Sequence, residues 1–220
     1  MNNWYDCIGV FIEESLNRFI CLVNVDGKIV ECYVQSSCRL DNFINLKGKT
    51  VFLKKILNPK RARYIVVGFK YKRIKALLSP KMANDLFFDY LSSRKSAYLG
   101  DRKNIKKEYI IGNYKSDFYI PSSKKVFEIK AIIDFSDKAI FPSVYSERAI
   151  KQLIEIEKLL DNGYCCYYEI ISLNPLINDI EFDMKQKLSI ELQRLIAKGL
   201  IIEFKKAVCK NNCWKLANFL

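Results

Sequence analysis

The chain contains no histidine, although it has 220 residues and eight cysteines. The spacing of Cys209 and Cys213 suggests a metal site, but without histidine a zinc site there would be two ligands short. Several cysteines lie in apolar, strand-like runs, where a free thiol behaves as a small hydrophobic side chain. We therefore expect reduced thiols rather than a zinc centre or a disulfide framework.

The chain also lacks a long hydrophobic run, and its first residues do not resemble an export signal. No apolar stretch approaches the roughly 20 residues of a transmembrane helix. The first residues, Met1–Asp6, have neither a basic start nor a signal-like apolar segment. Hydrophobic residues make up 50% of the chain, which is enough for a core. Together these features predict a soluble cytoplasmic protein with no membrane partner.

Acidic residues are missing between Asp41 and Asp85. That interval holds twelve Lys and Arg residues and carries +12, almost the whole net charge of +13. Aromatic residues such as Phe52, Tyr64 and Phe69 are interleaved with them. This combination favours a nucleic-acid partner over a solvated basic face, and the strand-like alternation disfavours a membrane surface. The residues expected to contact nucleic acid are Lys54, Lys55, Lys60, Arg61, Arg63, Lys70, Lys72 and Arg73.

The N-terminal third reads as short strands separated by turn residues. Asp26-Gly27 is a strong hairpin signal between two of them. Five short strands predict a small barrel, for which the OB-fold is the natural five-stranded candidate, although other small barrels fit the spacing. The predicted strands are Cys7–Glu13, Arg18–Val25, Lys28–Gln35, Lys49–Leu57 and Arg63–Lys72.

The rest of the chain alternates helical and strand patterns. Ser79-Pro80 predicts a helix start within a connector, and Ser146-Glu147 predicts the start of a second helix that runs to about Leu160. The predicted strands are Tyr114–Ile120, Val126–Ile133, Tyr164–Ser172 and Leu200–Val208, with a last helix over Glu181–Lys198.

Asp117, Glu128 and Lys130 form the most informative pattern. Glu128 and Lys130 share one strand face because residues i and i+2 point the same way, and Asp117 lies beside them if the two strands pair as a hairpin. Two carboxylates can hold Mg²⁺ or Mn²⁺, and the lysine can stabilise charge on a phosphate. This is the layout of the PD-(D/E)xK nucleases, whereas the simpler interpretation is an ordinary solvated strand face.

Four blocks around this pattern resemble the sugar fermentation stimulation protein family. They are Ser116-Asp117-Phe118, Phe127-Glu128-Ile129-Lys130, Phe141-Pro142 and Ser146-Glu147-Arg148. The resemblance implies an OB-like β-barrel followed by a PD-(D/E)xK nuclease-like α/β domain. It also places Glu108 at the family's acidic position before the hairpin, and Gln152 where the family usually carries a histidine.

We accordingly expect an OB-like domain over residues 1–72, a helical connector over 73–104 and a nuclease-like domain over 105–220. The expected function is Mg²⁺- or Mn²⁺-dependent hydrolysis of DNA or RNA. Asp117, Glu128 and the carbonyl of Ile129 would hold the metal, and Lys130 would stabilise the phosphate. Further candidates for the catalytic site are Glu108, Arg148 and Gln152. The alternative is a non-catalytic, DNA-binding regulator on a nuclease fold.

Overall fold

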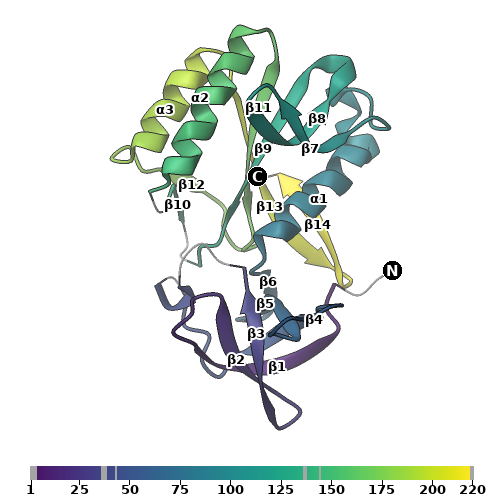
Figure 1. Ribbon diagram of the computed structural model, residues 1–220, viewed down its shortest axis with the longest axis vertical. Helices are drawn as coiled ribbons and strands as arrows, with labels where there is room; N and C mark the ends of the chain where they lie inside the picture. The colour runs from purple at the N-terminus through teal and green to yellow at the C-terminus, as the bar shows by residue number, and fades with distance from the viewer. Residues whose placement is uncertain (1–3, 36–38, 43, 136–137, 144, 219–220) are drawn as a thin grey trace.

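The computed structural model describes residues 4–35, 39–42, 44–135, 138–143 and 145–218. It has a β-barrel at one end and an α/β domain at the other (Figure 1). This architecture confirms the predicted fold class, an OB-like barrel followed by an α/β domain. The boundaries at residues 72 and 104 remain a prediction.

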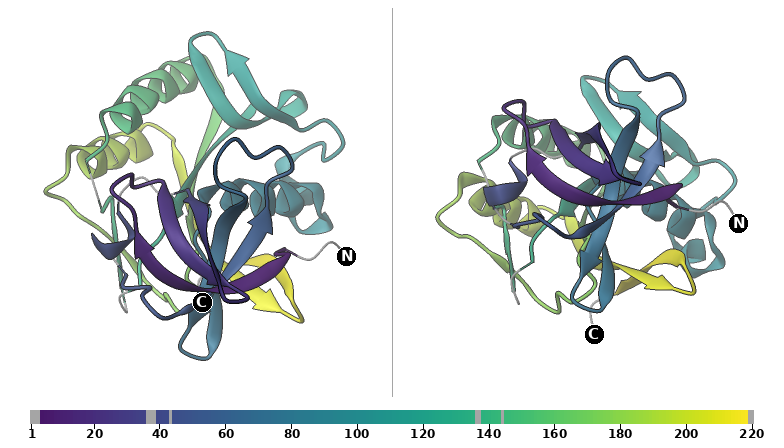
Figure 2. Two further views of the ribbon diagram at one scale, coloured as in Figure 1. Left: turned by 60° about the horizontal axis from the view of Figure 1, so that its bottom comes forward. Right: turned by 90° about the horizontal axis from the view of Figure 1, so that it is seen from below.

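The barrel consists of five strands that close on themselves. They follow the order β3-β2-β1-β4-β5, and a parallel pairing between β3 and β5 completes the ring (Figure 2). Asp26 and Gly27 adopt φ angles of 50° and 83°, which form the tight turn between β2 and β3. The strands are β1 (Cys7–Glu14), β2 (Ile20–Val25), β3 (Lys28–Val34), β4 (Thr50–Lys55) and β5 (Tyr64–Tyr71).

A sixth strand, β6 (Ile74–Leu77), lies where the sequence predicts a helical connector. It pairs with β5 through a two-residue turn, in which Lys72 has a φ of 53°. A lysine is an uncommon residue for this left-handed conformation, so the sequence carries no turn signal there. At its end, the Leu77 N–H donates to the carbonyl of Leu173 at 3.1 Å and thereby links the barrel to the α/β domain.

The α/β domain is built on a mixed sheet with the order β14-β13-β11-β9-β8-β7. Helix α1 covers one face, and α2 and α3 cover the other (Figure 1). The sheet strands are β7 (Lys106–Ile111), β8 (Tyr114–Ile120), β9 (Lys125–Ile132), β11 (Cys165–Ser172), β13 (Ile201–Lys210) and β14 (Cys213–Asn218). The helices are α1 (Pro80–Ser92), α2 (Glu147–Asp161) and α3 (Lys187–Ala197).

The smaller elements complete the connections. Strands β10 (Ala139–Phe141) and β12 (Ile180–Phe182) pair in parallel beside the main sheet. Residues 180–182 form strand β12, and helix α3 begins only at Lys187. The predicted helix start at Glu181 is therefore wrong. Short 3₁₀ turns are η1 (Leu40–Asn42), η2 (Arg94–Leu99) and η3 (Pro121–Ser123).

One hydrophobic core is shared by the barrel and the α/β domain. Trp4, just before β1, packs its ring against Phe52 of β4 at 4.8 Å and against Trp214 of β14 at 5.4 Å. Gly68 makes this possible, because a Cβ atom there would lie 3.2 Å from the Trp4 ring and 2.4 Å from the carbonyl of Ala76. The same core continues to α1 and to the centre of the sheet.

The structure bears on the expected absence of a membrane-spanning segment and on the state of the cysteines. Within the described ranges, no helix is long and apolar enough to cross a membrane. The seven cysteines in those ranges are free thiols. Cys38 lies outside them.

Candidate functional site

The β8–β9 hairpin brings the predicted acids together. Its ladder pairs Phe118 with Phe127, and Asp117 and Glu128 are the next residues away from the turn. There the Asp117 side chain reaches across, and its Oδ2 accepts the Ile129 N–H at 2.7 Å. Asn84 of α1 donates to the other oxygen, Oδ1, at 3.1 Å. The Asp117 carboxylate is therefore fixed by two donors from different elements.

Glu128, Lys130 and Gln152 form the centre of the site. The Lys130 ammonium lies 2.6 Å from Glu128 Oε1 and 2.8 Å from the side-chain oxygen of Gln152 on α2. Glu128 is only 3% exposed, so the interpretation of this strand face as solvated is wrong. The face is covered because α2 packs over it. The Lys130 side chain, at 23% exposure, still reaches solvent.

Two tyrosines line the inner side of the site. The Tyr114 hydroxyl donates to Glu128 Oε2. Tyr168 of β11 stands in register with Glu128 on the neighbouring strand, and within the described part of the chain its buried hydroxyl has no hydrogen-bond partner. Burial raises the pKa of Tyr168 well above its usual value, and the charges of Glu128 and Asp117 raise it further. Tyr168 therefore stays protonated and can donate toward the carboxylates.

Asp117 holds its proton unusually tightly. Burial, and then the negative charge of Glu128, raise its pKa to about 6, although Ile129, Lys130 and Asn84 all act in the opposite direction. Two carboxylates that share a poorly solvated place repel each other. A cation near both would relieve this repulsion.

The donor set suits a hard divalent cation. It offers carboxylate oxygens from Asp117 and Glu128 and the nearby carbonyl of Ile129, which are the ligand types that Mg²⁺ and Ca²⁺ prefer. The unpartnered hydroxyl of Tyr168 adds a polar atom that a metal-bound water could satisfy. Among the described residues, no three His, Cys, Asp or Glu side chains form a metal-binding group, so the carbonyl and water would complete the coordination.

Two predicted site residues lie away from this centre. Glu108 is opposite Asp117 on β7, between Lys107 and Tyr109, but its exposed carboxylate pairs with Lys115 at 2.8 Å. Arg148 is exposed near the start of α2, one helical turn before Gln152.

The eight basic residues predicted to contact nucleic acid are all exposed on the barrel, but they form two groups. Lys54, Lys55, Lys60, Arg61 and Arg63 surround the β4–β5 loop. Lys70, Lys72 and Arg73 surround the β5–β6 turn at the other end of β5. Arg61 is partly neutralised, because Glu31 binds its guanidinium through two hydrogen bonds of 2.6 and 2.7 Å.

Three residues of the site were not predicted from sequence: Asn84, Tyr114 and Tyr168. Asn84 lies in a helix whose pattern indicates only a buried stripe, and Tyr168 lies in a run of apolar strand residues. Tyr114 stands three residues before Asp117, which is not a spacing that places two side chains together in a strand. Each joins the site through tertiary packing, so no local signal identifies it.

Comparison with known proteins places the chain in a family. Residues 81–212 match the model of the sugar fermentation stimulation protein RE domain. The sugar fermentation stimulation protein homolog of Desulfitobacterium hafniense (strain Y51) is 28% identical over 159 residues, which cover 70% of this chain and 68% of the relative. The homolog of Methanobrevibacter smithii is 26% identical over 185 residues, which cover 78% of this chain and 77% of the relative.

The fold agrees with a solved structure as well. The structure of Pyrococcus furiosus SfsA in complex with Ca²⁺ superposes with a TM-score of 0.78 and covers 99% of this chain and 96% of that one, at 18% identity. This likeness concerns the fold, whereas the family-model match covers more than half of the sequence. The chain therefore belongs to the sugar fermentation stimulation protein family.

Proposed function

We propose that this protein is a metal-dependent nuclease that hydrolyses phosphodiester bonds in DNA or RNA. The observation that carries the proposal is the meeting of Asp117, Glu128 and Lys130 at one place on the sheet, with Gln152 holding the lysine from α2. Two acids and a lysine on adjacent strands can bind a metal and a phosphate side by side.

Asp117 and Glu128, with the carbonyl of Ile129, would hold the divalent ion. A bound Mg²⁺ or Mn²⁺ supplies a Lewis acid that polarises the phosphate and lowers the pKa of water. The solved SfsA complex with Ca²⁺ supports a divalent ion of this class at the fold. Ca²⁺ takes the same oxygen ligands with looser geometry, so we expect it to support binding without turnover.

Lys130 would stabilise the charge that develops on the phosphate during cleavage. Its ammonium already lies at the solvent-facing side of Glu128, and Gln152 limits its movement. Gln152 has no proton to exchange near neutral pH. It therefore positions Lys130 and does not act as an acid or base.

The test is cleavage of labelled single- and double-stranded DNA and RNA with Mg²⁺, Mn²⁺ or a chelator. Asp117→Asn keeps the shape of the side chain but removes a metal-binding charge. Metal-dependent cleavage should therefore be lost, while binding of nucleic acid in the presence of Ca²⁺ should persist. The matched control is Asp89→Asn on the exposed side of α1, which should cleave like the wild type. Undiminished cleavage by Asp117→Asn would contradict the proposed site.

A second candidate function is a nucleic-acid-binding protein whose site does not cut. Two observations favour it: the Glu128 carboxylate already has Lys130 and Tyr114 as partners, and among the residues that the structure describes only two acids meet at the site. Tight binding with no cleavage of any substrate, in either metal, would support this candidate.

A further inference from the structure

A row of three tyrosines crosses the α2 face of the sheet beside the site. The ring of Tyr109, on edge strand β7, stacks on that of Tyr119 of β8, with centroids 5.2 Å apart and planes inclined by 20°. Tyr119 in turn lies 6.2 Å from Tyr164, which precedes β11. Tyr109 is 43% exposed, and the other two are partly exposed. None of the three is needed by the proposed chemistry.

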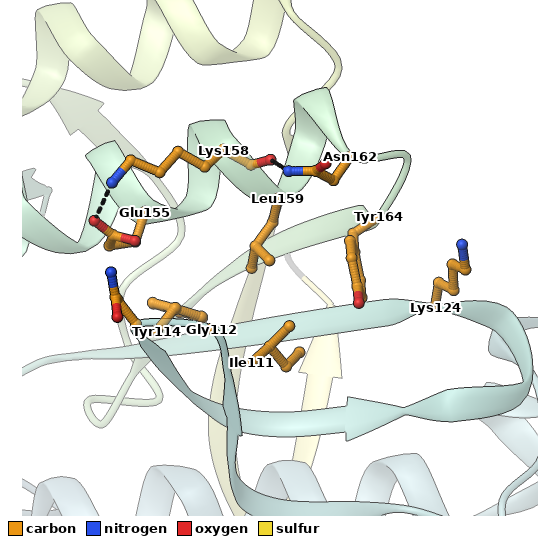
Figure 3. A pocket seen from close by; sticks show the side chains of 10 residues that line it. Ile111, Gly112, Tyr114, Lys124, Glu155, Lys158, Leu159, Asn162 and Tyr164 are labelled. Atoms are coloured by element: carbon orange, nitrogen blue, oxygen red, sulfur yellow. Dashed lines mark hydrogen bonds and ion pairs between the residues drawn. The ribbon is translucent and has the colours of Figure 1, made fainter.

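The row ends in a groove that lies beside the candidate site. The groove lies between the β7–β8 hairpin and the second half of α2, and its volume is about 500 Å³. Figure 3 shows Tyr164 and Leu159 pointing into it, with Ile111 facing them from the hairpin. Tyr114 lines the groove and also donates to Glu128, so the groove and the candidate metal site share a wall. A volume of this size suits a group as large as a nucleotide.

The surroundings of the row are basic. Residues 102–125, which include the hairpin, hold seven Lys and Arg residues against two acids, a net charge of +5. One of these acids, Glu108, is paired with Lys115. Lys124 lines the groove, with its ammonium 5.7 Å from the centre of the Tyr164 ring. On the opposite wall, Lys158 is paired with Glu155 at 2.6 Å.

Positive charge with stackable rings fits an unpaired nucleic-acid strand better than another protein strand. Five of the six residues of β7 are exposed, but lysines at positions 106 and 107 discourage pairing with a further strand at this edge. Bases of a duplex have no free faces, whereas unpaired bases stack on aromatic side chains irrespective of their sequence. Strands β7 and β8, which carry Tyr109 and Tyr119, belong to the α/β domain and not to the barrel (Figure 1).

We infer that the Tyr109–Tyr119–Tyr164 row and the adjoining groove bind single-stranded nucleic acid by base stacking and guide it to the Asp117–Glu128 site. This rests on the proposed function for its substrate class, but it does not require cleavage. Lys124 would contact the phosphates, and the barrel lysines would add attraction that is independent of the bases.

The experiment compares two labelled twelve-nucleotide probes, oligo(dT) and an abasic strand with the same phosphates, in a chelator so that no turnover occurs. Tyr109→Leu, Tyr119→Leu and Tyr164→Leu should each weaken oligo(dT) binding about five-fold or more and leave abasic binding unchanged. The matched Tyr→Phe variants keep the ring and should bind like the wild type.

Two controls separate this effect from general ones. Tyr98→Leu removes an exposed tyrosine outside the row and should change neither probe. Charge reversal at Lys54, Lys55 and Arg63 should weaken both probes alike. Thermal melts identify a variant that fails to fold, and Tyr109→Leu on the exposed edge strand provides the test if Tyr119→Leu does not fold.

The outcomes keep this inference apart from the proposed function. The stacking role of the row would be contradicted if folded Leu variants bind oligo(dT) like the wild type, or if the wild type binds both probes equally. This holds even if cleavage occurs. If the wild type binds oligo(dT) more tightly than the abasic strand, the Leu variants lose this preference and no substrate is cleaved, the stacking role of the tyrosine row is supported and the proposed nuclease activity is contradicted.

Discussion

Two buried Glu–Lys clusters lie on opposite faces of the same sheet, and they have different characters. On the α2 face, Lys130 contacts Glu128 and Gln152 and is 23% exposed. On the α1 face, Lys205 of β13 is 1% exposed and contacts Glu169 of β11 at 2.8 Å and Glu203 on its own strand.

The two clusters differ in whether a substrate could reach the lysine. Lys205 is sealed under α1, with the ring of Tyr90 5.1 Å from its ammonium, so no substrate can reach it. The Lys130 ammonium contacts the neutral side-chain amide of Gln152, and the lysine side chain is partly exposed to solvent. A second acid, Asp117, adjoins it. Both clusters place two carboxylates near one lysine, so it is the exposure of the lysine that distinguishes the candidate site from the structural cluster.

Removing the sealed lysine should have the largest effect. Lys205→Met leaves Glu169 and Glu203 without their shared cation in the core, so the free energy of unfolding should fall by about 3–5 kcal/mol. Urea unfolding measures this, with Lys215→Met, an exposed lysine of β14, as the control. A loss below about 1 kcal/mol would mean that the cluster is not the structural element we describe.

Removing the open lysine should affect turnover more than stability. Lys130→Met should lower the single-turnover cleavage rate by about 10²–10³-fold, the scale seen when one stabilising donor is lost. The free energy of unfolding should fall by no more than about 1–2 kcal/mol, because Tyr114 still donates to Glu128 and water can replace the ammonium. A variant that cuts at the wild-type rate would refute the role given to Lys130.

The sealed cluster should also make the stability of the protein depend on pH. Burial raises the pKa of Glu169 to about 7, although Lys205 opposes the shift. Between about pH 4.5 and 7, folded Glu169 holds a proton that the unfolded chain has lost, so the free energy of unfolding falls as pH rises through this window. Above the window the dependence ends.

Glu169→Gln should remove this component, which amounts to up to about 3 kcal/mol between pH 4.5 and 7.5. The measurement is the difference in unfolding free energy between the two pH values in wild type and variant. Asp117, whose raised pKa of about 6 acts in the same direction, is present in both proteins and cancels. Identical pH profiles would show that folding does not raise the pKa of Glu169.

The local features of the fold could be predicted because short-range chemistry sets them. Ser146 accepts a hydrogen bond from the Ala149 N–H at 3.2 Å, as expected for a helix cap, and α2 extends to Asp161, one residue past the predicted end. Asn211 and Asn212 form the two-residue turn before β14, with φ angles of 51° and 61°, and asparagine is a residue that favours such a hairpin turn.

The candidate site could be predicted only where its residues are close in sequence. Glu128 and Lys130 are related by strand periodicity, and Asp117 by the hairpin. Asn84 and Gln152 reach the site from helices 33 and 22 residues away from their partners, so only packing brings them there. The burial of Glu128 was unpredictable for the same reason, because α2 must dock before that face is covered.

The Trp4 contacts have a consequence for how the molecule comes apart. Trp4 joins the start of the chain to Phe52 in the barrel and to Trp214 near its end, within a core that continues to α1. Neither domain can lose its packing without exposing apolar surface of the other. Heating should therefore produce one cooperative transition with a single heat-absorption peak, as in a one-domain protein. We therefore expect the barrel and the sheet to melt at the same temperature.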